Sequence, residues 1–85
     1  MTYQIIFSDE ALSVLRKLET KDSERILAKF EAAASNPNHF FERLEGREDY
    51  KLRAGDFRAL AKIDHENKTI FVVTLGHRKN VYKRN

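Results

Sequence analysis

The sequence predicts an α+β fold, in which an N-terminal strand, a helical hairpin and a three-stranded antiparallel meander form one sheet with the helices on one face. Three observations predict it. Apolar and polar residues alternate near the N-terminus, two segments with helical spacing follow, and alternating runs separated by turns fill the second half. A chain of 85 residues supports one modest core, so we expect a single domain over 1–85.

The N-terminal strand is indicated by apolar residues at alternate positions from Tyr3 to Phe7. Ile6 falls on the polar side, which leaves open whether this strand is covered on both faces. Ser8 then offers an N-cap for a first helix over about 9–19, and two acidic residues in its first turn complement the helix dipole.

A second helix follows after a short join, and either Thr20 or Asp22 can cap it. Its apolar stripe consists of Ile26, Leu27, Phe30, Ala33 and Ala34. Asn36-Pro37 ends it, because the residue before proline avoids the helical region. The segment 38–49 has no regular pattern, and we expect a loop that its apolar residues anchor to the core.

The meander is predicted as three strands over 50–53, 57–63 and 69–75. Turn-forming residues at 54–56 and 65–68 separate them. The last run is apolar almost throughout, which predicts a strand buried on both faces.

The register of the first hairpin decides which side chains share a face, because a slip of one residue turns every side chain over. If Arg53 pairs with Arg58, an apolar set points toward the helices: Tyr50, Leu52, Ala59, Ala61 and Ile63. A cationic set then points the other way: Lys51, Arg53, Arg58 and Lys62. Pairing Arg53 with Phe57 mixes apolar and cationic residues on both faces, so burial favours the first register.

Positive charge is concentrated in the second half of the chain. Residues 1–42 hold five Lys/Arg and seven Asp/Glu, whereas residues 43–85 hold eleven and six. Gly76 breaks the last apolar run, and a basic tail follows over 77–85. Such clustering is typical of a surface that binds polyanions, with an ordinary solvated face as the alternative.

Several classes of protein are excluded or disfavoured. Without cysteine there is no disulfide framework and no thiolate metal site, and a reducing compartment fits. His39, His65 and His77 lack metal-ligand spacing, so we expect no metal and no cofactor. Neither a leader peptide nor an apolar run of about 18 residues occurs, which predicts a cytoplasmic protein with no membrane partner.

The remaining candidate chemistry is that of Lys, Arg and Tyr. Cations stabilise charge growing on a phosphate, and a tyrosine transfers a proton if neighbouring cations lower its pKa. No metal is needed when the nucleophile is the ribose 2′-hydroxyl of the substrate, and that requirement restricts cleavage to RNA.

Two blocks, Tyr50-Lys-Leu-Arg-Ala-Gly-Asp-Phe-Arg58 and Gly76-His-Arg-Lys-Asn-Val-Tyr82, resemble the RelE branch of the RelE/ParE toxin superfamily. The likeness covers nearly the whole chain and includes the strand–helix–helix start. It implies the toxin of a type II toxin-antitoxin system, a ribosome-dependent, metal-independent endoribonuclease that cleaves mRNA in the A site. It also implies a RelB-like antitoxin partner, and a toxin-antitoxin complex that binds operator DNA through the antitoxin.

By this resemblance, Lys51 and Arg58 contact or stabilise the scissile phosphate. Arg78 does likewise or protonates the leaving group through a relay, and Tyr82 stacks on or activates the nucleotide. Further RNA-binding candidates are Arg53, Lys62, His77, Lys79, Lys83 and Arg84. The second lysine of the family, two residues before Lys51, is Asp49 here, which leaves the identity of the general base open.

Other interpretations remain for single residues and for the whole chain. Arg53 alternatively pairs with Glu48 or Asp56 on the surface, Tyr82 alternatively pins the tail to the core, and the basic pair 83–84 alternatively serves solubility alone. The chain is alternatively a ParE-like inhibitor of DNA gyrase, or a non-catalytic basic module that binds RNA or a partner. An expected lack of stacking aromatic residues on the cationic side argues against the last interpretation.

Overall fold

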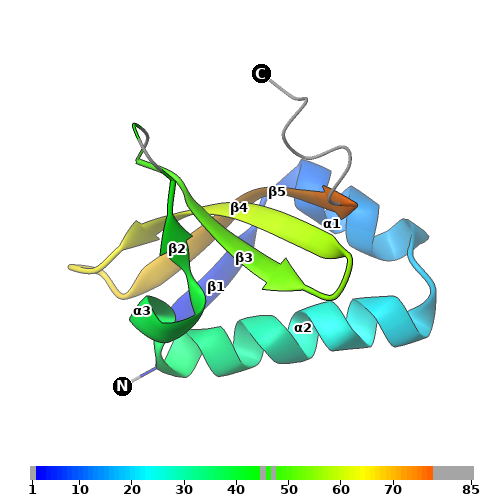
Figure 1. Ribbon diagram of the computed structural model, residues 1–85, viewed down its shortest axis with the longest axis horizontal. Helices are drawn as coiled ribbons and strands as arrows, with labels where there is room; N and C mark the ends of the chain where they lie inside the picture. The colour runs from blue at the N-terminus through cyan, green and yellow to red at the C-terminus, as the bar shows by residue number, and fades with distance from the viewer. Residues whose placement is uncertain (1, 45, 47, 78–85) are drawn as a thin grey trace.

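The computed structural model describes residues 2–44, 46 and 48–77 (Figure 1). Within these residues the elements are β1 (Gln4–Phe7), α1 (Asp9–Lys17), α2 (Thr20–Ser35), α3 (Pro37–Phe40), β2 (Glu42–Arg43), β3 (Tyr50–Ala54), β4 (Phe57–Asp64) and β5 (Thr69–His77). The strands form one sheet in the order β1-β5-β4-β3-β2, in which β1 runs parallel to β5 and the other neighbours are antiparallel. The predicted α+β class is confirmed, with one strand more than predicted.

Ser8 joins β1, α1 and β5. Its hydroxyl oxygen accepts a hydrogen bond from the Ala11 N–H at 3.0 Å, which caps α1, and its hydroxyl donates to the Val73 carbonyl at 2.6 Å. The predicted N-cap is therefore confirmed, and the same side chain also attaches the start of α1 to β5.

Helix α2 begins earlier than predicted. Glu19 is its N-cap residue and makes no side-chain capping bond, so the predicted cap by Thr20 or Asp22 is wrong. Leu27 was expected in the buried stripe but is 44% exposed, while the rest of the stripe is buried: Ile26, Phe30, Ala33 and Ala34. No helix among the described residues combines the length and the apolar character needed to cross a membrane.

The core lies between α2 and one face of the sheet (Figure 1). Phe30 of α2 is 2% exposed, and its ring lies 5.4 Å from that of Phe7 and 6.2 Å from that of Phe41. The sheet contributes small and branched side chains to this core: Leu52, Ala54, Ala59, Ala61, Ile70, Val72 and Leu75. Three of these seven side chains are alanines, which leave room for the large ring of Phe30.

The segment predicted as a loop, 38–49, contains two short elements instead. Pro37 begins the four-residue helix α3, and Phe41, 6% exposed, anchors the chain that follows it. Strand β2 then pairs with the start of β3. Elements of two and four residues are too short to show a periodic pattern, so no pattern in the sequence predicts them.

Strand β5 differs from its prediction in two respects. It continues through Gly76 to His77, and it is not buried on both faces, because Phe71 is 39% exposed. Ile6 of β1 pairs with Phe71 and is 42% exposed, so β1 is not covered on both faces either. The apolar run predicted two covered faces, whereas α2 covers only one.

Replacing Ser8 with alanine removes the cap of α1 and the hydroxyl donor to Val73. We expect the Ser8→Ala variant to lose about 1–2 kcal/mol of unfolding free energy, measured by urea denaturation. Ser23→Ala is the matched control, because the Ser23 hydroxyl makes one exposed bond to the Thr20 carbonyl. It is expected to stay within about 0.5 kcal/mol of the wild type. Equal losses for both variants would contradict the role of Ser8.

The turn between β4 and β5 carries a second prediction. The Asp64 carboxylate accepts hydrogen bonds from the Asn67 side-chain amide at 2.8 Å and backbone N–H at 3.1 Å. These hydrogen bonds lower the pKa of the Asp64 carboxyl below its ordinary value of 3.8, and the bond from the Asn67 side chain has the largest effect. Their contribution to stability is therefore present above the unfolded pKa and lost as the pH falls through the folded one.

In the Asn67→Ala variant the pKa of Asp64 is expected to rise toward 3.8, because the strongest donor is gone. An NMR titration of the Asp64 carboxyl carbon in both proteins measures this. An unchanged midpoint would contradict the assignment of the amide as the main cause.

Candidate functional site

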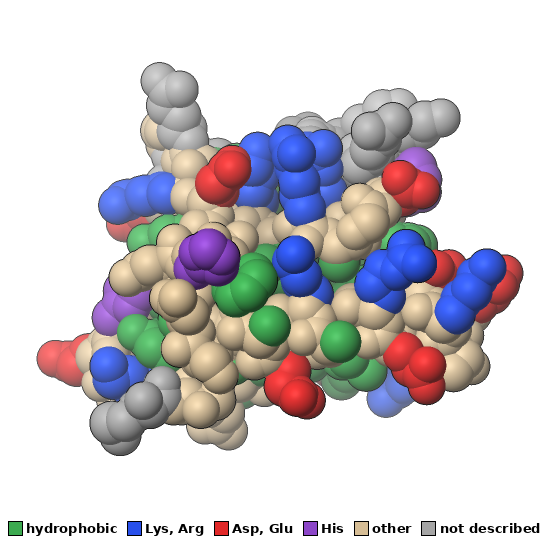
Figure 2. Space-filling view, turned by 60° about the horizontal axis from the view of Figure 1, so that its bottom comes forward, with side chains coloured by type: hydrophobic (Ala, Val, Ile, Leu, Met, Phe, Trp, Pro, Cys, Tyr) green, Lys and Arg blue, Asp and Glu red, His purple; other side chains and the backbone are tan. Residues whose placement is uncertain are grey.

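The cations selected from the sequence lie on the side of the sheet away from α2. Strands β3 and β4 pair Arg53 with Arg58 and Leu52 with Ala59, so the predicted register is confirmed. Leu52 and Ala59 are buried in the core, whereas Arg53 is exposed. We call Lys51, Arg53, Arg58 and Lys62 the cationic face. In the space-filling view, Lys and Arg side chains gather side by side at the upper centre of the molecule (Figure 2).

Arg53, Arg58 and Gly76 form a row across three strands, since each pairs with the next. Side chains at directly opposite positions have Cβ atoms about 4.5–5.5 Å apart, and like charges there repel. A bound anion removes this repulsion. Gly76 has no side chain, so this position of the row presents only backbone.

Two lysines of the cationic face, Lys51 and Lys62, form ion pairs with carboxylates. Glu42 of β2 lies opposite Lys51, and its Oε2 is 3.2 Å from the Lys51 Nζ. Asp49 Oδ1 is 3.6 Å from the Lys62 Nζ. The Lys51 side chain is only 19% exposed, so its ammonium is held in place more firmly than that of Lys62, which is 61% exposed. The carboxylates lower the positive potential around both lysines.

Apolar side chains lie among the cations. Leu60 and Thr74 pair with each other on this face and are 8% and 6% exposed, and the Thr74 hydroxyl donates a hydrogen bond to the Glu10 carboxylate of α1. Phe71 pairs with Lys62 on the same face and is 39% exposed. The expected lack of aromatic residues here is therefore wrong, and the argument drawn from it against a passive RNA-binding module no longer holds.

The other predicted site residues divide into two groups. His77 pairs with Phe57, their rings lie 6.0 Å apart, and strand alternation places it on the opposite face from Arg58. The structure thus does not bring His77 together with the cationic face. The remaining candidates lie outside the described residues: Arg78, Lys79, Tyr82, Lys83 and Arg84.

The structure bears directly on the alternative given for Arg53. Arg53 forms no ion pair with Glu48 or Asp56, all three of which are described, so the surface-pairing alternative is not observed. In the part of the chain that is described, no group of three or more His, Asp or Glu side chains is placed to hold a metal ion.

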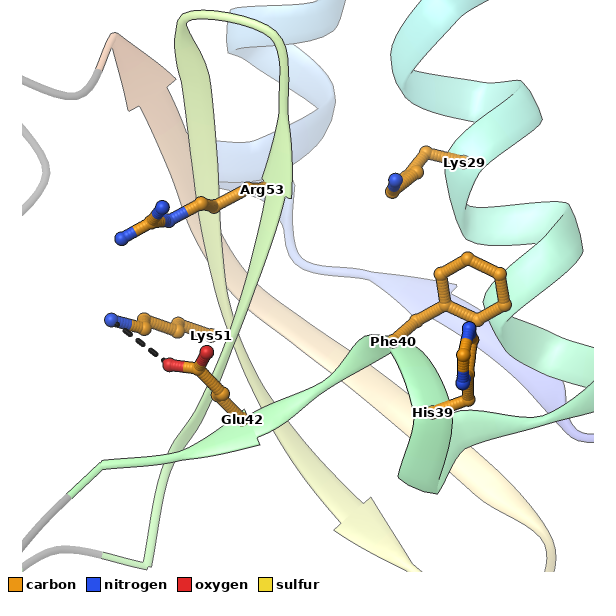
Figure 3. Close-up of a pocket in the computed structure, with 6 residues that line it drawn as sticks. All are labelled: Lys29, His39, Phe40, Glu42, Lys51 and Arg53. Atoms are coloured by element: carbon orange, nitrogen blue, oxygen red, sulfur yellow. Dashed lines mark ion pairs between the residues drawn. The ribbon is translucent and has the colours of Figure 1, made fainter.

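Three residues that no sequence motif points to lie beside this face. Lys29, His39 and Phe40 line a pocket together with Lys51 and Arg53 (Figure 3). They come from α2 and α3, and no spacing in the sequence links them to the β3 motif. The one available signal, an aromatic residue next to histidine in the 38–49 segment, is too common to have identified them.

Comparison of the sequence with family models gives one finding that covers almost the whole chain. A model described as the ParE toxin of the type II toxin-antitoxin system parDE matches residues 5–82. A protein named toxin RelE4 from Methanocaldococcus jannaschii is 32% identical over 78 residues, covering 89% of this chain and 83% of that protein. A RelE-like toxin protein of Escherichia coli is 32% identical over 82 residues, covering 93% and 86%.

Solved structures share the fold. The toxin-antitoxin complex RelBE2 from Mycobacterium tuberculosis contains a chain that matches with a TM-score of 0.82 and 25% identity, covering 92% of this chain and 100% of that one. The isolated Escherichia coli RelE toxin matches with a TM-score of 0.73 and 27% identity, covering 95% and 92%. The archaeal RelE–RelB complex from Pyrococcus horikoshii matches with a TM-score of 0.79 at 24% identity, a likeness of fold.

The ion pair between Glu42 and Lys51 predicts how the cationic face responds to one change. Glu42→Gln is expected to bind heparin more tightly and to elute from a heparin column at higher salt, because Lys51 loses its carboxylate. Stability is expected to change by less than about 1 kcal/mol, since Glu42 is largely exposed. Glu66→Gln, an exposed site on the β4–β5 turn, is the control of equal charge change. If both variants elute at an equally increased salt concentration, the result would contradict a local effect of Glu42 on Lys51.

Proposed function

Because the chain belongs to the RelE/ParE toxin superfamily of type II toxin-antitoxin systems, on its RelE branch, we propose that it is a ribosome-dependent endoribonuclease that cuts mRNA in the A site. The observation that carries this proposal is the row Arg53–Arg58–Gly76, two guanidinium groups on adjacent strands beside a bare backbone position. A phosphodiester has the charge and bulk that such a row accommodates.

In the proposed reaction the ribose 2′-oxygen attacks the adjacent phosphorus. A 2′-O–P bond forms, the P–O5′ bond breaks, the 2′-hydroxyl proton passes to a general base, and the O5′ leaving group gains a proton. The products are a 2′,3′-cyclic phosphate and a 5′-hydroxyl. Since the nucleophile belongs to the substrate, the protein contributes charge and proton transfer, and no metal is required by this chemistry.

The residues of this chain take the roles implied by the family resemblance. Lys51 and Arg58 stabilise negative charge that grows on the phosphoryl oxygens. Arg78 adds to that stabilisation or protonates O5′ through a relay, and Tyr82 stacks on or activates the nucleotide. Arg53 binds the RNA beside Arg58, as their opposite positions on β3 and β4 allow. Lys62 binds RNA at the other end of the cationic face, and Lys79, Lys83 and Arg84 of the tail extend the contact.

We further propose a RelB-like antitoxin as partner, acting with this toxin in the cytoplasm, where ribosomes are present. Complexes of RelE with RelB are the subject of the solved structures from Mycobacterium tuberculosis and Pyrococcus horikoshii, which supports a partner of this kind. An antitoxin that covers the cationic face with acidic residues places negative charge next to Arg53 and Arg58. Its binding stabilises the folded toxin by mass action. The complex then binds operator DNA through the antitoxin.

A second candidate is inhibition of DNA gyrase without RNA cleavage. It is favoured by the family model that matches residues 5–82, which is that of the ParE toxin. A third is passive RNA binding, which exposed Phe71 beside Lys62 permits through base stacking. Gyrase inhibition and RNA binding without cleavage are both measurable with the same purified protein.

Arg58→Ala is expected to lower the rate of mRNA cleavage on programmed ribosomes by about 100-fold or more, because a cation that stabilises the transition state is removed. Purified protein is added to ribosomes translating a defined mRNA, and RNA ends are mapped by primer extension. Arg16→Ala, at the exposed end of α1, removes the same charge from a residue that is not part of the cationic face and is expected to cleave like the wild type.

Wild-type cleavage by Arg58→Ala would contradict the assignment of the site. Intact mRNA with every protein, together with loss of gyrase supercoiling activity, would favour the ParE-like function. Tight RNA binding without cleavage would favour the passive module. Urea denaturation of each variant confirms that the fold is retained.

A further inference from the structure

A pocket of about 240 Å³ lies beside the cationic face, between the edge of β3 and helices α2 and α3 (Figure 3). Its lining residues are Lys29, His39, Phe40, Glu42, Lys51 and Arg53. Lys51 and Arg53 already belong to the proposed catalytic surface. The other four have no role in the reaction described above, and three of them carry either a cation or an aromatic ring.

The pocket follows from the way the chain crosses from α2 to β3. Strand β2 has only two residues, which pair with Tyr50 and Lys51, so no strand among the described residues pairs with Arg53 on this side of β3. Pro37 ends α2 and turns the chain into α3, whose Phe40 packs against the core. A gap therefore remains where the sheet edge, α2 and α3 meet.

The charge around the gap is predominantly positive. Three cations line the pocket, Lys29, Lys51 and Arg53, together with one carboxylate, that of Glu42. The Glu42 Oε2 lies 3.2 Å from the Lys51 Nζ. The Lys29 Nζ stands 5.3 Å from the centre of the Phe40 ring. In Figure 3, Lys29 and Phe40 lie on one side of the gap, and Arg53 and Lys51 lie on the other with their charged ends pointing away from Lys29. Lys29 and Arg53 thus supply positive charge that Glu42 does not balance.

Aromatic rings accompany this charge. His39 and Phe40 lie edge to face with ring centres 4.8 Å apart, and His39 is exposed. Proteins that bind single-stranded nucleic acid combine cations, which bind the sugar-phosphate backbone, with aromatic rings, on which the bases stack. An acidic peptide would use the cations but has no need of the rings.

We propose that this pocket binds the nucleotide next to the scissile phosphate, with Lys29 on its phosphate and the His39–Phe40 rings against its base. The inference rests on the proposed function, because it places the pocket along an RNA strand already held at Arg58. The row Gly76–Arg58–Arg53 ends at the free edge of β3, and the pocket opens directly beyond it. An RNA strand that follows the row and then passes around this edge of the sheet reaches Lys29 next.

The test compares Lys29→Gln with Lys21→Gln, which removes the same charge near the start of the same helix, away from the pocket. Each protein binds a short fluorescent 2′-O-methyl oligoribonucleotide, which lacks the reacting hydroxyl and stays intact. Affinity is measured by anisotropy at several salt concentrations. Lys29→Gln is expected to bind about five-fold more weakly, and the slope of log K against log salt is expected to fall by about 0.7, the value for one phosphate contact on a single strand.

Lys21→Gln is expected to keep the wild-type affinity and slope, and urea denaturation checks that both variants fold. The proposal is overturned if Lys29→Gln binds as well as the wild type, or if both variants lose the same amount. It is also overturned if Lys29→Gln weakens binding of the antitoxin but not of the oligoribonucleotide. That result would assign the pocket to a carboxylate of the antitoxin. Since no cleavage is measured, this outcome is independent of the ribosome assay that tests the proposed function.

Discussion

The register of the β3–β4 hairpin is the constraint on which the rest of the structure depends. With Arg53 opposite Arg58, the alternate positions Leu52 and Ala59 enter the core under α2. A shift of one residue would bury the guanidinium groups and expose the apolar side chains. The hydrophobic effect that builds the core thus also brings two cations together on the other side, at an electrostatic cost that a bound anion offsets.

This arrangement places the hydrophobic core and the cations on opposite faces of one sheet. Phe30 and the small side chains of β4 hold α2 against one face, and the opposite face carries the cations. Acidic residues at the edge moderate that charge, since Glu42 lies against Lys51 and Asp49 against Lys62. Arg53 and Arg58 lie directly opposite each other on β3 and β4, so two positive charges are brought together there.

The sequence predicted most of what local rules govern and missed what depends on distant partners. Alternation predicted β1, β3, β4 and β5, capping predicted the start of α1 at Ser8, and burial of apolar side chains predicted the Arg53–Arg58 register. The parallel pairing of β1 with β5 was not predicted, because partner choice between distant strands leaves no local pattern. For the same reason Phe71 was expected to be buried, and Lys29 was not connected with the cationic face.

The central claim is that the cationic face promotes attack by a hydroxyl of the RNA itself. The most direct measurement uses ribosomes programmed with an mRNA that carries a single 2′-deoxynucleotide immediately 5′ to the mapped cut. The account predicts that cleavage at that position disappears, while a 2′-deoxynucleotide one position further upstream leaves it intact. Continued cleavage at the substituted position would contradict the account, because the nucleophile would then come from the protein or from water.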